Sequence, residues 1–219
     1  MNSNKIEKGK GFKELILKIN KIKKTHTKEV ISKRIKEFKS FKNKSNVEFF
    51  KELCFCLMTA NFNAERSIMI QEKINNGFLT LNQEQLAKTL KELGHRFPNM
   101  RAKYIVEARA YKENIKDTLY SLKDDLERRN WLVKHIKGLG LKEASHFLRN
   151  TGFLNVAIID FHIVDLLAEY KIIEKPKSLT KTKYLQIEEK LKTLSEKLNL
   201  SLGELDLYLW FLETGKVLK

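Results

Sequence analysis

Apolar residues recur along almost the whole chain at the i, i+3, i+4, i+7 spacing of amphipathic helices. Near the start, the series is Phe12, Leu15, Ile16 and Ile19, and a less complete one follows at Ile31, Ile35 and Phe38. Near the end, it is Tyr184, Ile187, Leu191, Leu194 and Leu198. No segment shows the convincing alternation of apolar and polar residues that marks a half-buried strand. The pattern therefore predicts an all-α fold.

Capping signals predict where these helices begin and end. Ser45 stands three residues before Glu48, which is the spacing of a capping box, and Val47–Met58 is apolar nearly all round, as in a buried central helix. Glycines 77, 94 and 152 are expected to end helices. The expected helices between the two terminal series are 47–58 and about 64–76, 83–93, 98–114, 122–137, 141–151 and 161–171, and a last one follows Ser201.

The charge of the chain points to a polyanionic partner. Lys and Arg number 43 against 27 Asp and Glu, a formal net charge of +16, and residues 1–44 alone carry 15 basic and 4 acidic side chains. Phosphates supply most of the non-specific affinity of basic proteins for nucleic acid. Nucleic acid is therefore the favoured partner; the alternative is lysines that simply solvate helix faces.

Cysteine usage and hydropathy restrict the class of protein further. Cys54 and Cys56 are the only cysteines, so neither a disulfide framework nor a four-ligand metal site can form from them, and we expect two buried free thiols. We expect no metal and no other cofactor. No apolar stretch reaches the roughly 20 residues of a membrane span, and no signal-peptide core is present. These features predict a soluble, cytoplasmic protein.

The segment Ile-Lys-Gly-Leu-Gly-Leu-Lys-Glu-Ala at 136–144 joins two of the expected helices. Gly138 and Gly140 permit a tight turn that exposes N–H groups, and the following helix directs its positive dipole end to the same place. Such a turn can bind a DNA phosphate without reading sequence. Leu139 is expected to anchor the turn in the core. The alternative is an ordinary connector between helices.

Lys142 lies in the first turn of the helix after this segment, where the helix dipole disfavours a cation. It lies about 200° around the helix from Ala144, which belongs to the apolar face, so it should point away from the helix's own core. Loss of the proton is favoured at such a position and converts an amine into a nucleophile. The alternative is a solvated surface lysine.

Asp160 follows Lys142 by eighteen residues and directly precedes an apolar helix face. Its expected role is the N-cap of that helix. Capping is compatible with catalysis because it holds the carboxylate rigidly at the helix mouth. His162 is expected to be structural or to face a phosphate, since no second His or Cys stands at metal-ligand spacing.

The segment 138–144 together with Ile159-Asp160-Phe161-His162 resembles the helix–hairpin–helix DNA glycosylase superfamily. Residues 137–150, residues 57–67 and Arg96-Phe97, followed by Arg101, are most similar to its short archaeal and bacterial class of 8-oxoguanine DNA glycosylase/AP lyase. The similarity covers most of the chain beyond about residue 25. No Cys follows Cys56, so the four-cysteine iron–sulfur cluster of the endonuclease III and adenine-mismatch branches is absent.

The resemblance implies a fold of two helical lobes with the active site in the cleft between them. Residues 1–219 would form a single catalytic unit, with a first lobe at about 45–120. The second lobe would comprise about 121–219 with the N-terminal helices at 10–42, and the helix–hairpin–helix motif would lie at about 124–151. The partner would be double-stranded DNA containing an oxidised base, bound in the prokaryotic nucleoid by a monomer without a small-molecule cofactor.

The resemblance also implies roles for individual residues. Lys142 would be the nucleophile that forms a Schiff base, and Asp160 its carboxylate partner. The backbone hairpin would be formed by Gly138, Leu139 and Gly140. The base-binding group would comprise Trp210, which would stack on 8-oxoguanine, Lys219, whose terminal carboxylate would bind it, and Phe97, which would line the pocket or wedge into the DNA. For Trp210 and Phe97 the alternative is core packing.

Two other functions fit the same sequence. One is a related glycosylase for another damaged base, which a panel of lesion-bearing duplexes would identify. The other is a non-catalytic helix–hairpin–helix module that binds DNA, which would form no covalent adduct with DNA under borohydride.

Overall fold

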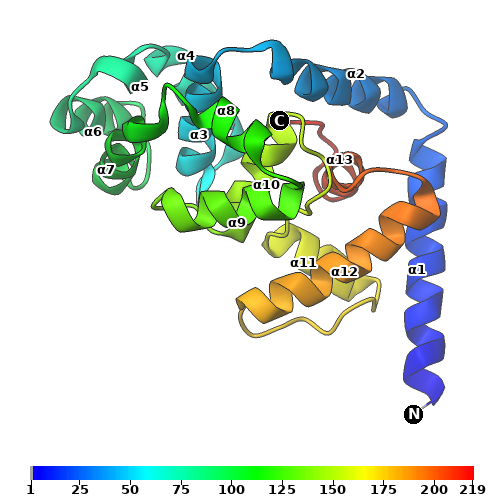
Figure 1. The fold of residues 1–219 in the computed structure, drawn as a ribbon. Coiled ribbons are helices and arrows are strands. Elements are labelled where there is room, and N and C mark those ends of the chain that lie inside the picture. The colour runs from blue at the N-terminus through cyan, green and yellow to red at the C-terminus, as the bar shows by residue number, and fades with distance from the viewer. Residues whose placement is uncertain (1) are drawn as a thin grey trace. The chain divides into compact units, whose positions relative to one another are not determined.

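Residues 2–219 are described by a computed structural model, with side chains from residue 9 onward, and every regular element among these residues is a helix (Figure 1). The predicted all-α fold is therefore confirmed for this part of the chain. The chain forms two compact units, Met1–Lys39 together with Phe153–Lys219, and Ser40–Gly152. We call them the terminal unit and the hairpin unit.

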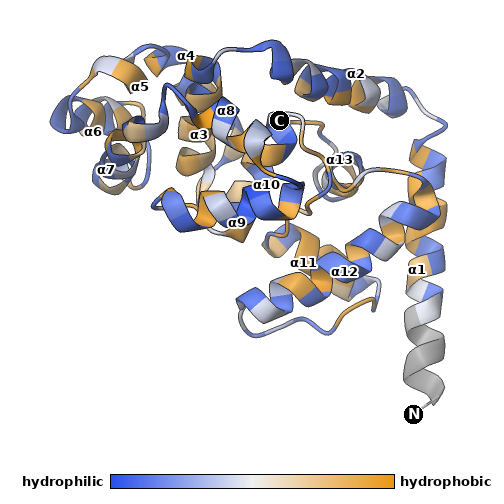
Figure 2. Cartoon of the chain, in the orientation of Figure 1, coloured by the Kyte–Doolittle hydropathy of each residue, from blue (hydrophilic) through white to orange (hydrophobic). Residues whose placement is uncertain are grey.

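The terminal unit contains helices from both ends of the chain. Its helices are α1 (Asn2–Ile22), α2 (Thr27–Ser40), α11 (Phe161–Glu169), α12 (Lys181–Leu198) and α13 (Leu202–Thr214). Helix α13 packs against α1, α11 and α12. Figure 2 shows on α2 and α12 the mixture of apolar and polar residues that an amphipathic pattern produces. In α2, the predicted positions Ile31, Ile35 and Phe38 are the buried ones.

The hairpin unit is built around one buried helix. Its helices are η1 (Phe41–Asn43), α3 (Asn46–Thr59), α4 (Ala64–Ile74), α5 (Gly77–Thr80), α6 (Gln83–Glu92), α7 (Pro98–Ala108), η2 (Arg109–Tyr111), α8 (Ile115–Ser121), α9 (Asp125–His135) and α10 (Leu141–Asn150). Helix α3 contacts α4, α7, α8 and α10. Ser45 Oγ accepts a hydrogen bond from Glu48 N at 3.3 Å. The predicted central helix and its N-cap are confirmed.

Two of the expected boundaries were wrong. Helix α4 ends at Ile74 because Asn75 adopts φ 43°, and Gly77 begins α5 instead of ending α4. Asn tolerates positive φ better than most residues, so it can end a helix in place of Gly. The single helix expected over 98–114 is also interrupted. At η2 the Arg109 guanidinium donates to Phe78 O at 2.8 Å and to Leu81 O at 2.6 Å, and α8 then follows as a separate helix.

Residues 121–152 belong to the hairpin unit. They are grouped there with residues 40–120, and the expected assignment of about 121–219 to a second lobe stays a prediction. The physical reason is that α10 packs on α3 as well as on α9. The apolar face of α10, which includes the fully buried Ala144, Phe147 and Leu148, is thus part of the hairpin unit's core.

A buried polar network joins three helices of the hairpin unit. Glu52 of α3 is only 4% exposed, and its carboxylate accepts from Asn150 Nδ2 at 2.7 Å and from Gln71 Nε2 at 3.1 Å. Arg149 donates to Asn150 Oδ1 from Nε at 3.1 Å and from Nη2 at 2.9 Å. The negative charge in the core is therefore held by hydrogen bonds from α4 and α10.

Among the described residues, we find no helix with both the length and the apolar character needed to cross a membrane.

We predict that Glu52→Ala destabilises the protein by about 3–5 kcal/mol, because it leaves buried donors without their carboxylate. Glu52→Gln is the matched control, since its amide oxygen can still accept from Asn150 Nδ2, and it should cost less. Urea unfolding measures both effects. Equal unfolding midpoints for the two variants would contradict a role for the hydrogen bond to Asn150.

Candidate active site

The segment between α9 and α10 is a tight hairpin whose apolar residues face the core. Ile136 N donates to Leu132 O at 2.9 Å, and Leu139 N donates to Ile136 O at 3.2 Å. Leu139 is 6% exposed and Ile136 is 1% exposed. The expectation that Leu139 anchors the turn is confirmed.

The two glycines of the hairpin serve different purposes. Gly138 adopts φ +94°, and a Cβ at this position would overlap the ring of Tyr104 in α7. Gly140 has an extended backbone, and a Cβ there would come 3.2 Å from the flexible carboxylate end of Glu143. Only Gly138 therefore needs to be glycine for both conformational and steric reasons.

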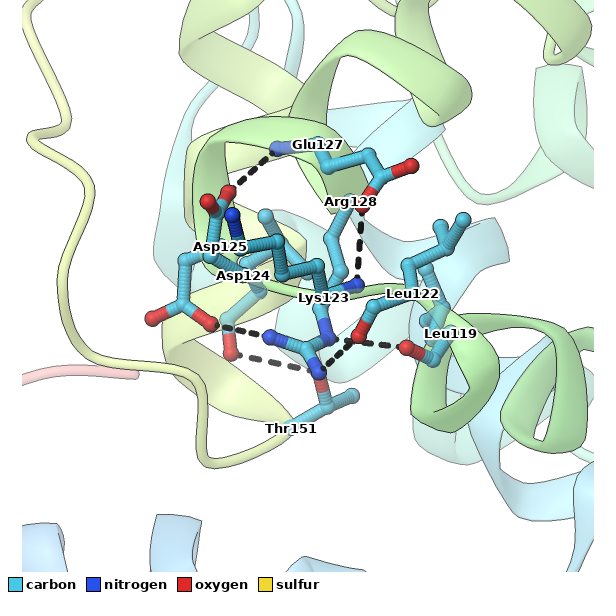
Figure 3. A network of polar contacts seen from close by, with 9 residues as sticks. Leu119, Leu122, Lys123, Asp124, Asp125, Glu127, Arg128 and Thr151 are labelled. Carbon is cyan, nitrogen blue, oxygen red and sulfur yellow. Dashed lines mark hydrogen bonds and ion pairs between the residues drawn. The ribbon is translucent and has the colours of Figure 1, made fainter.

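The entry into α9 is fixed by one arginine. Figure 3 shows the Arg128 guanidinium bound to the end of α8, where it donates to Leu119 O at 2.8 Å and to Leu122 O at 2.6 Å. It also donates to Asp125 Oδ1 at 2.8 Å in the first turn of α9. Asp124 caps the helix by accepting from Glu127 N at 2.9 Å. These contacts position the first helix of the hairpin.

Lys142 lies in the first turn of α10, as predicted, but it is not a freely solvated lysine. Its side chain is 23% exposed, compared with 60% for Lys137 in the same hairpin. Lys142 Nζ lies 3.6 Å from Glu143 Oε1, and Glu143 Oε2 accepts from Gly140 N at 3.3 Å. One carboxylate therefore contacts both the N-cap of α10 and the candidate nucleophile.

Asp160 is the N-cap of α11 in the terminal unit, and its Oδ1 accepts from Ile163 N at 3.1 Å. The extended segment before it is tied to α12. Tyr184 Oη donates to Ala157 O at 2.7 Å and accepts from Ile159 N at 3.2 Å, and Glu188 Oε1 accepts from Ala157 N at 2.8 Å. The predicted capping role is confirmed, and the half-buried carboxylate is held from both sides.

The helix that Asp160 caps lies beside the last turns of α13. The His162 ring makes an edge contact with Trp210, with ring centroids 5.1 Å apart, and His162 Nδ1 lies 3.5 Å from Glu213 Oε1. Trp210 is only half-buried, and its buried Nε1 has no hydrogen-bond partner. This exposure disfavours pure core packing for Trp210. Lys219 is half-buried too, five residues after Thr214, the last residue of α13.

Phe97 is the half-buried N-cap residue of α7 in the hairpin unit. The Arg96 and Arg101 guanidinium carbons lie 5.0 and 5.9 Å from the centre of its ring. Arg96 is exposed, whereas Arg101 is only 5% exposed, so Phe97 is a partly exposed ring beside one exposed and one buried cation. The predicted residues thus lie in two sets, with Lys142, the hairpin and Phe97 in one unit and Asp160, Trp210 and Lys219 in the other.

Several contributing residues were not found by sequence reasoning. Glu143 carried a usable signal, because it stands three residues after Gly140, at capping-box spacing. Tyr104, Tyr184 and Glu188 carried none, because each supports a segment that is distant along the chain.

The predicted pair of buried free thiols is confirmed, since Cys54 and Cys56 are both buried and unbonded to each other. Burial raises the pKa of the Cys54 thiol well above its ordinary value. Among the described side chains, no group of three or more His, Cys, Asp or Glu could hold a metal ion.

Comparison with known proteins gives consistent matches. Residues 31–200 match the model of a protein family described as 8-oxoguanine DNA glycosylase. An 8-oxoguanine DNA glycosylase/AP lyase of Methanocaldococcus jannaschii is 57% identical over 206 residues, which are 94% of this chain and 99% of the relative. The protein of the same name from Korarchaeum cryptofilum is 51% identical over 210 residues, covering 95% and 100% of the two chains.

A solved structure matches equally well. The Methanocaldococcus jannaschii 8-oxoguanine glycosylase/lyase in complex with a 15mer DNA containing 8-oxoguanine has a TM-score of 0.91 and 57% identity. The match covers 94% of this chain and 100% of the other.

We predict that Gly138→Ala destabilises the hairpin unit by about 1–3 kcal/mol, because the new Cβ requires both a strained φ and displacement of Tyr104. Gly140→Ala is the matched control and should cost less, since its backbone suits any residue and only a side-chain end must move. Thermal unfolding of the two variants provides the measurement. A Gly140→Ala protein that melts at or below the Gly138→Ala protein would refute this assignment.

Proposed function

Because this chain belongs to the 8-oxoguanine DNA glycosylase family, we propose that it excises 8-oxoguanine from DNA and then cleaves the strand by β-elimination. The observation that carries the proposal is the position and low exposure of Lys142. This lysine is a largely shielded amine at the N-terminus of the second hairpin helix, in a sequence that matches the family throughout this region. One Lys142 and one Asp160 suffice for the chemistry, so we propose a monomer that acts on nucleoid DNA.

The hairpin would hold the DNA backbone. The N–H groups in the first turn of α10 have no intrahelical acceptors, and the helix dipole adds a positive partial charge at the same end. A phosphate oxygen can accept from these groups whatever the sequence. Gly138 permits the close turn and Leu139 anchors it in the core, so the hairpin backbone would present these N–H groups to a phosphate without rearranging.

Lys142 and Asp160 would then act on the same extruded nucleotide. The damaged nucleotide must leave the stack before its sugar can be attacked. The neutral Lys142 amine forms a bond to C1′ while the bond from C1′ to the nucleobase breaks, and the nucleobase leaves with the proton that the attacking nitrogen gives up. The ionised Asp160 carboxylate stabilises the positive charge that develops on the sugar.

Strand cleavage follows from the covalent intermediate. Ring opening converts the Lys142 adduct to a Schiff base, which acidifies the hydrogens on C2′. A proton acceptor removes one of these hydrogens as a proton, the C3′–O bond breaks and the 3′ phosphate leaves. Every bond change in this sequence is provided for by an amine, a carboxylate and water.

Trp210, Lys219 and Phe97 would recognise the base. The half-buried Trp210 can stack on it, and the terminal carboxylate of Lys219 can accept from the N7–H that distinguishes 8-oxoguanine from guanine. Phe97 would fill the space that the extruded nucleotide vacates or line the pocket.

We predict that borohydride traps a covalent adduct between the wild-type protein and an 8-oxoguanine duplex, and that Lys142→Gln abolishes it. Asp160→Asn should still cap α11 through its amide oxygen, so it should fold normally while excision slows by at least about 100-fold. Lys192→Gln, at an exposed position in α12, is the matched control for removing a lysine charge. Gel analysis of the trapped product gives the readout.

Normal trapping with Lys142→Gln would remove this lysine from the mechanism. Trapping with other lesions but not with 8-oxoguanine would indicate a glycosylase for another damaged base. A wild-type protein that traps on no lesion and on no abasic site would be a non-catalytic module.

We further predict that a short extension after Lys219 reduces 8-oxoguanine excision about tenfold or more and spares lyase activity at preformed abasic sites. The extension moves the terminal carboxylate but leaves α13 intact, because that helix already ends at Thr214. Single-turnover rates on the two substrates separate the effects. Unchanged excision would exclude the terminal carboxylate from base recognition.

A further inference from the structure

The turn that carries Phe97 is fixed at its backbone by two hydrogen bonds. Phe97 N donates to His95 Nδ1 at 3.1 Å, and Phe97 O accepts from Arg101 N at 3.1 Å. The first bond lies outside the α7 helix and depends on a single side chain. No side-chain hydrogen bond of Phe97 itself is possible, so its position depends on what holds its main chain.

The His95 ring can form its hydrogen bonds to Met58 O and to Phe97 N–H at the same time in only one protonation state. His95 is 4% exposed, and its Nε2 lies 3.0 Å from Met58 O. A carbonyl oxygen only accepts, so Nε2 must carry the hydrogen, and Nδ1 must be the acceptor for Phe97 N–H. The two hydrogen bonds therefore require a neutral ring. Burial lowers the pKa of His95 and so acts in the same direction; the hydrogen bond to Met58 opposes this, and the charge of Arg101 adds to it.

The C-terminal end of α3 supports this turn through backbone carbonyl groups that have no acceptor role within the helix. Besides Met58 O, which binds His95, Ala60 O accepts from Arg101 Nη2 at 2.7 Å. The Phe62 ring covers His95 with centroids 4.2 Å apart. His95, two residues before Phe97, and Arg101, four residues after it, are thus both bound to the C-terminal end of α3, which belongs to the buried core of the hairpin unit.

We propose that His95 is a positioning residue for base extrusion: by bridging Met58 O and Phe97 N–H, it holds the Phe97 turn rigidly on α3 against the DNA. The inference rests on the proposed function, because only there does Phe97 contact DNA. Unstacking a base step costs a few kcal/mol, and the DNA resists the side chain that fills the gap. A side chain on a loosely held turn would be displaced by the DNA, whereas a side chain on a turn that is hydrogen-bonded to a buried helix keeps its position.

Two substitutions separate the halves of the bridge. His95→Asn places an amide oxygen near the position of Nδ1, so it can still accept from Phe97 N–H but loses the bond to Met58 O. His95→Gln places an amide nitrogen near the position of Nε2, so it can still donate to Met58 O but releases Phe97. Each variant leaves one buried backbone group unpaired, so the two should lose similar stability. His26→Asn, at an exposed position in the terminal unit, is the matched control.

The first measurement is hydrogen exchange of the Phe97 amide in the free protein. We expect exchange to accelerate at least about tenfold in His95→Gln and to remain near the wild-type rate in His95→Asn. Unchanged exchange in His95→Gln would overturn the proposed bridge. This result requires no enzymatic activity, so it is independent of the proposed function.

The second measurement is the single-turnover rate of 8-oxoguanine excision at saturating protein. We expect His95→Gln to slow excision about tenfold or more relative to His95→Asn, with a smaller effect on lyase action at preformed abasic sites. In a Phe97→Ala background, His95→Gln should have no further effect. Equal excision by the two His95 variants, or a full additional loss in Phe97→Ala, would overturn the positioning role. A wild-type protein without excision would instead refute the proposed function and leave the exchange result standing.

Discussion

The packing of α10 on the buried helix α3 is the interaction on which the arrangement of the hairpin unit depends. It buries the apolar face of α10, and it brings Asn150 to the carboxylate of Glu52 in the core. The direction of α10 is therefore fixed by contacts along its length. These contacts also fix the position of its N-terminus, where Lys142 lies. The other end of α3 binds His95 through Met58 O. One largely buried helix thus determines the positions of the candidate nucleophile and of the Phe97 turn.

In the terminal unit, the candidate carboxylate is held in position by hydrogen bonds from a neighbouring helix. Asp160 follows an extended segment whose backbone groups would be costly to bury unpaired. Tyr184 and Glu188 of α12 supply those partners, so the same hydrogen bonds that allow burial also hold Asp160 in place. The N-cap bond to Ile163 N fixes its side chain. Rigidity at this position is therefore a consequence of satisfying buried polar groups.

The sequence predicted the features that depend on local spacing. The all-α fold, the buried helix after Ser45, the hairpin anchored by Leu139 and the capping role of Asp160 all follow from periodicity or capping rules. The grouping of residues 121–152 with residues 40–120 was not predictable in this way, because it depends on which surface the apolar face of α10 meets. His95 was missed for the same reason, since its partner Met58 lies thirty-seven residues away along the chain. The joint action of Lys142 and Asp160 stays a prediction.

Placing a lysine in the first turn of a helix couples DNA binding to chemistry. The positive end of the dipole of α10 attracts a phosphate to the helix end at which Lys142 lies. The Glu143 carboxylate is shared between Lys142 and the Gly140 N–H, which keeps the lysine beside the N-cap of α10. A hairpin that only bound phosphate would gain from the same helix end but would have no need of a shielded lysine in it. The 23% exposure of Lys142 thus favours a catalytic hairpin over a purely binding one.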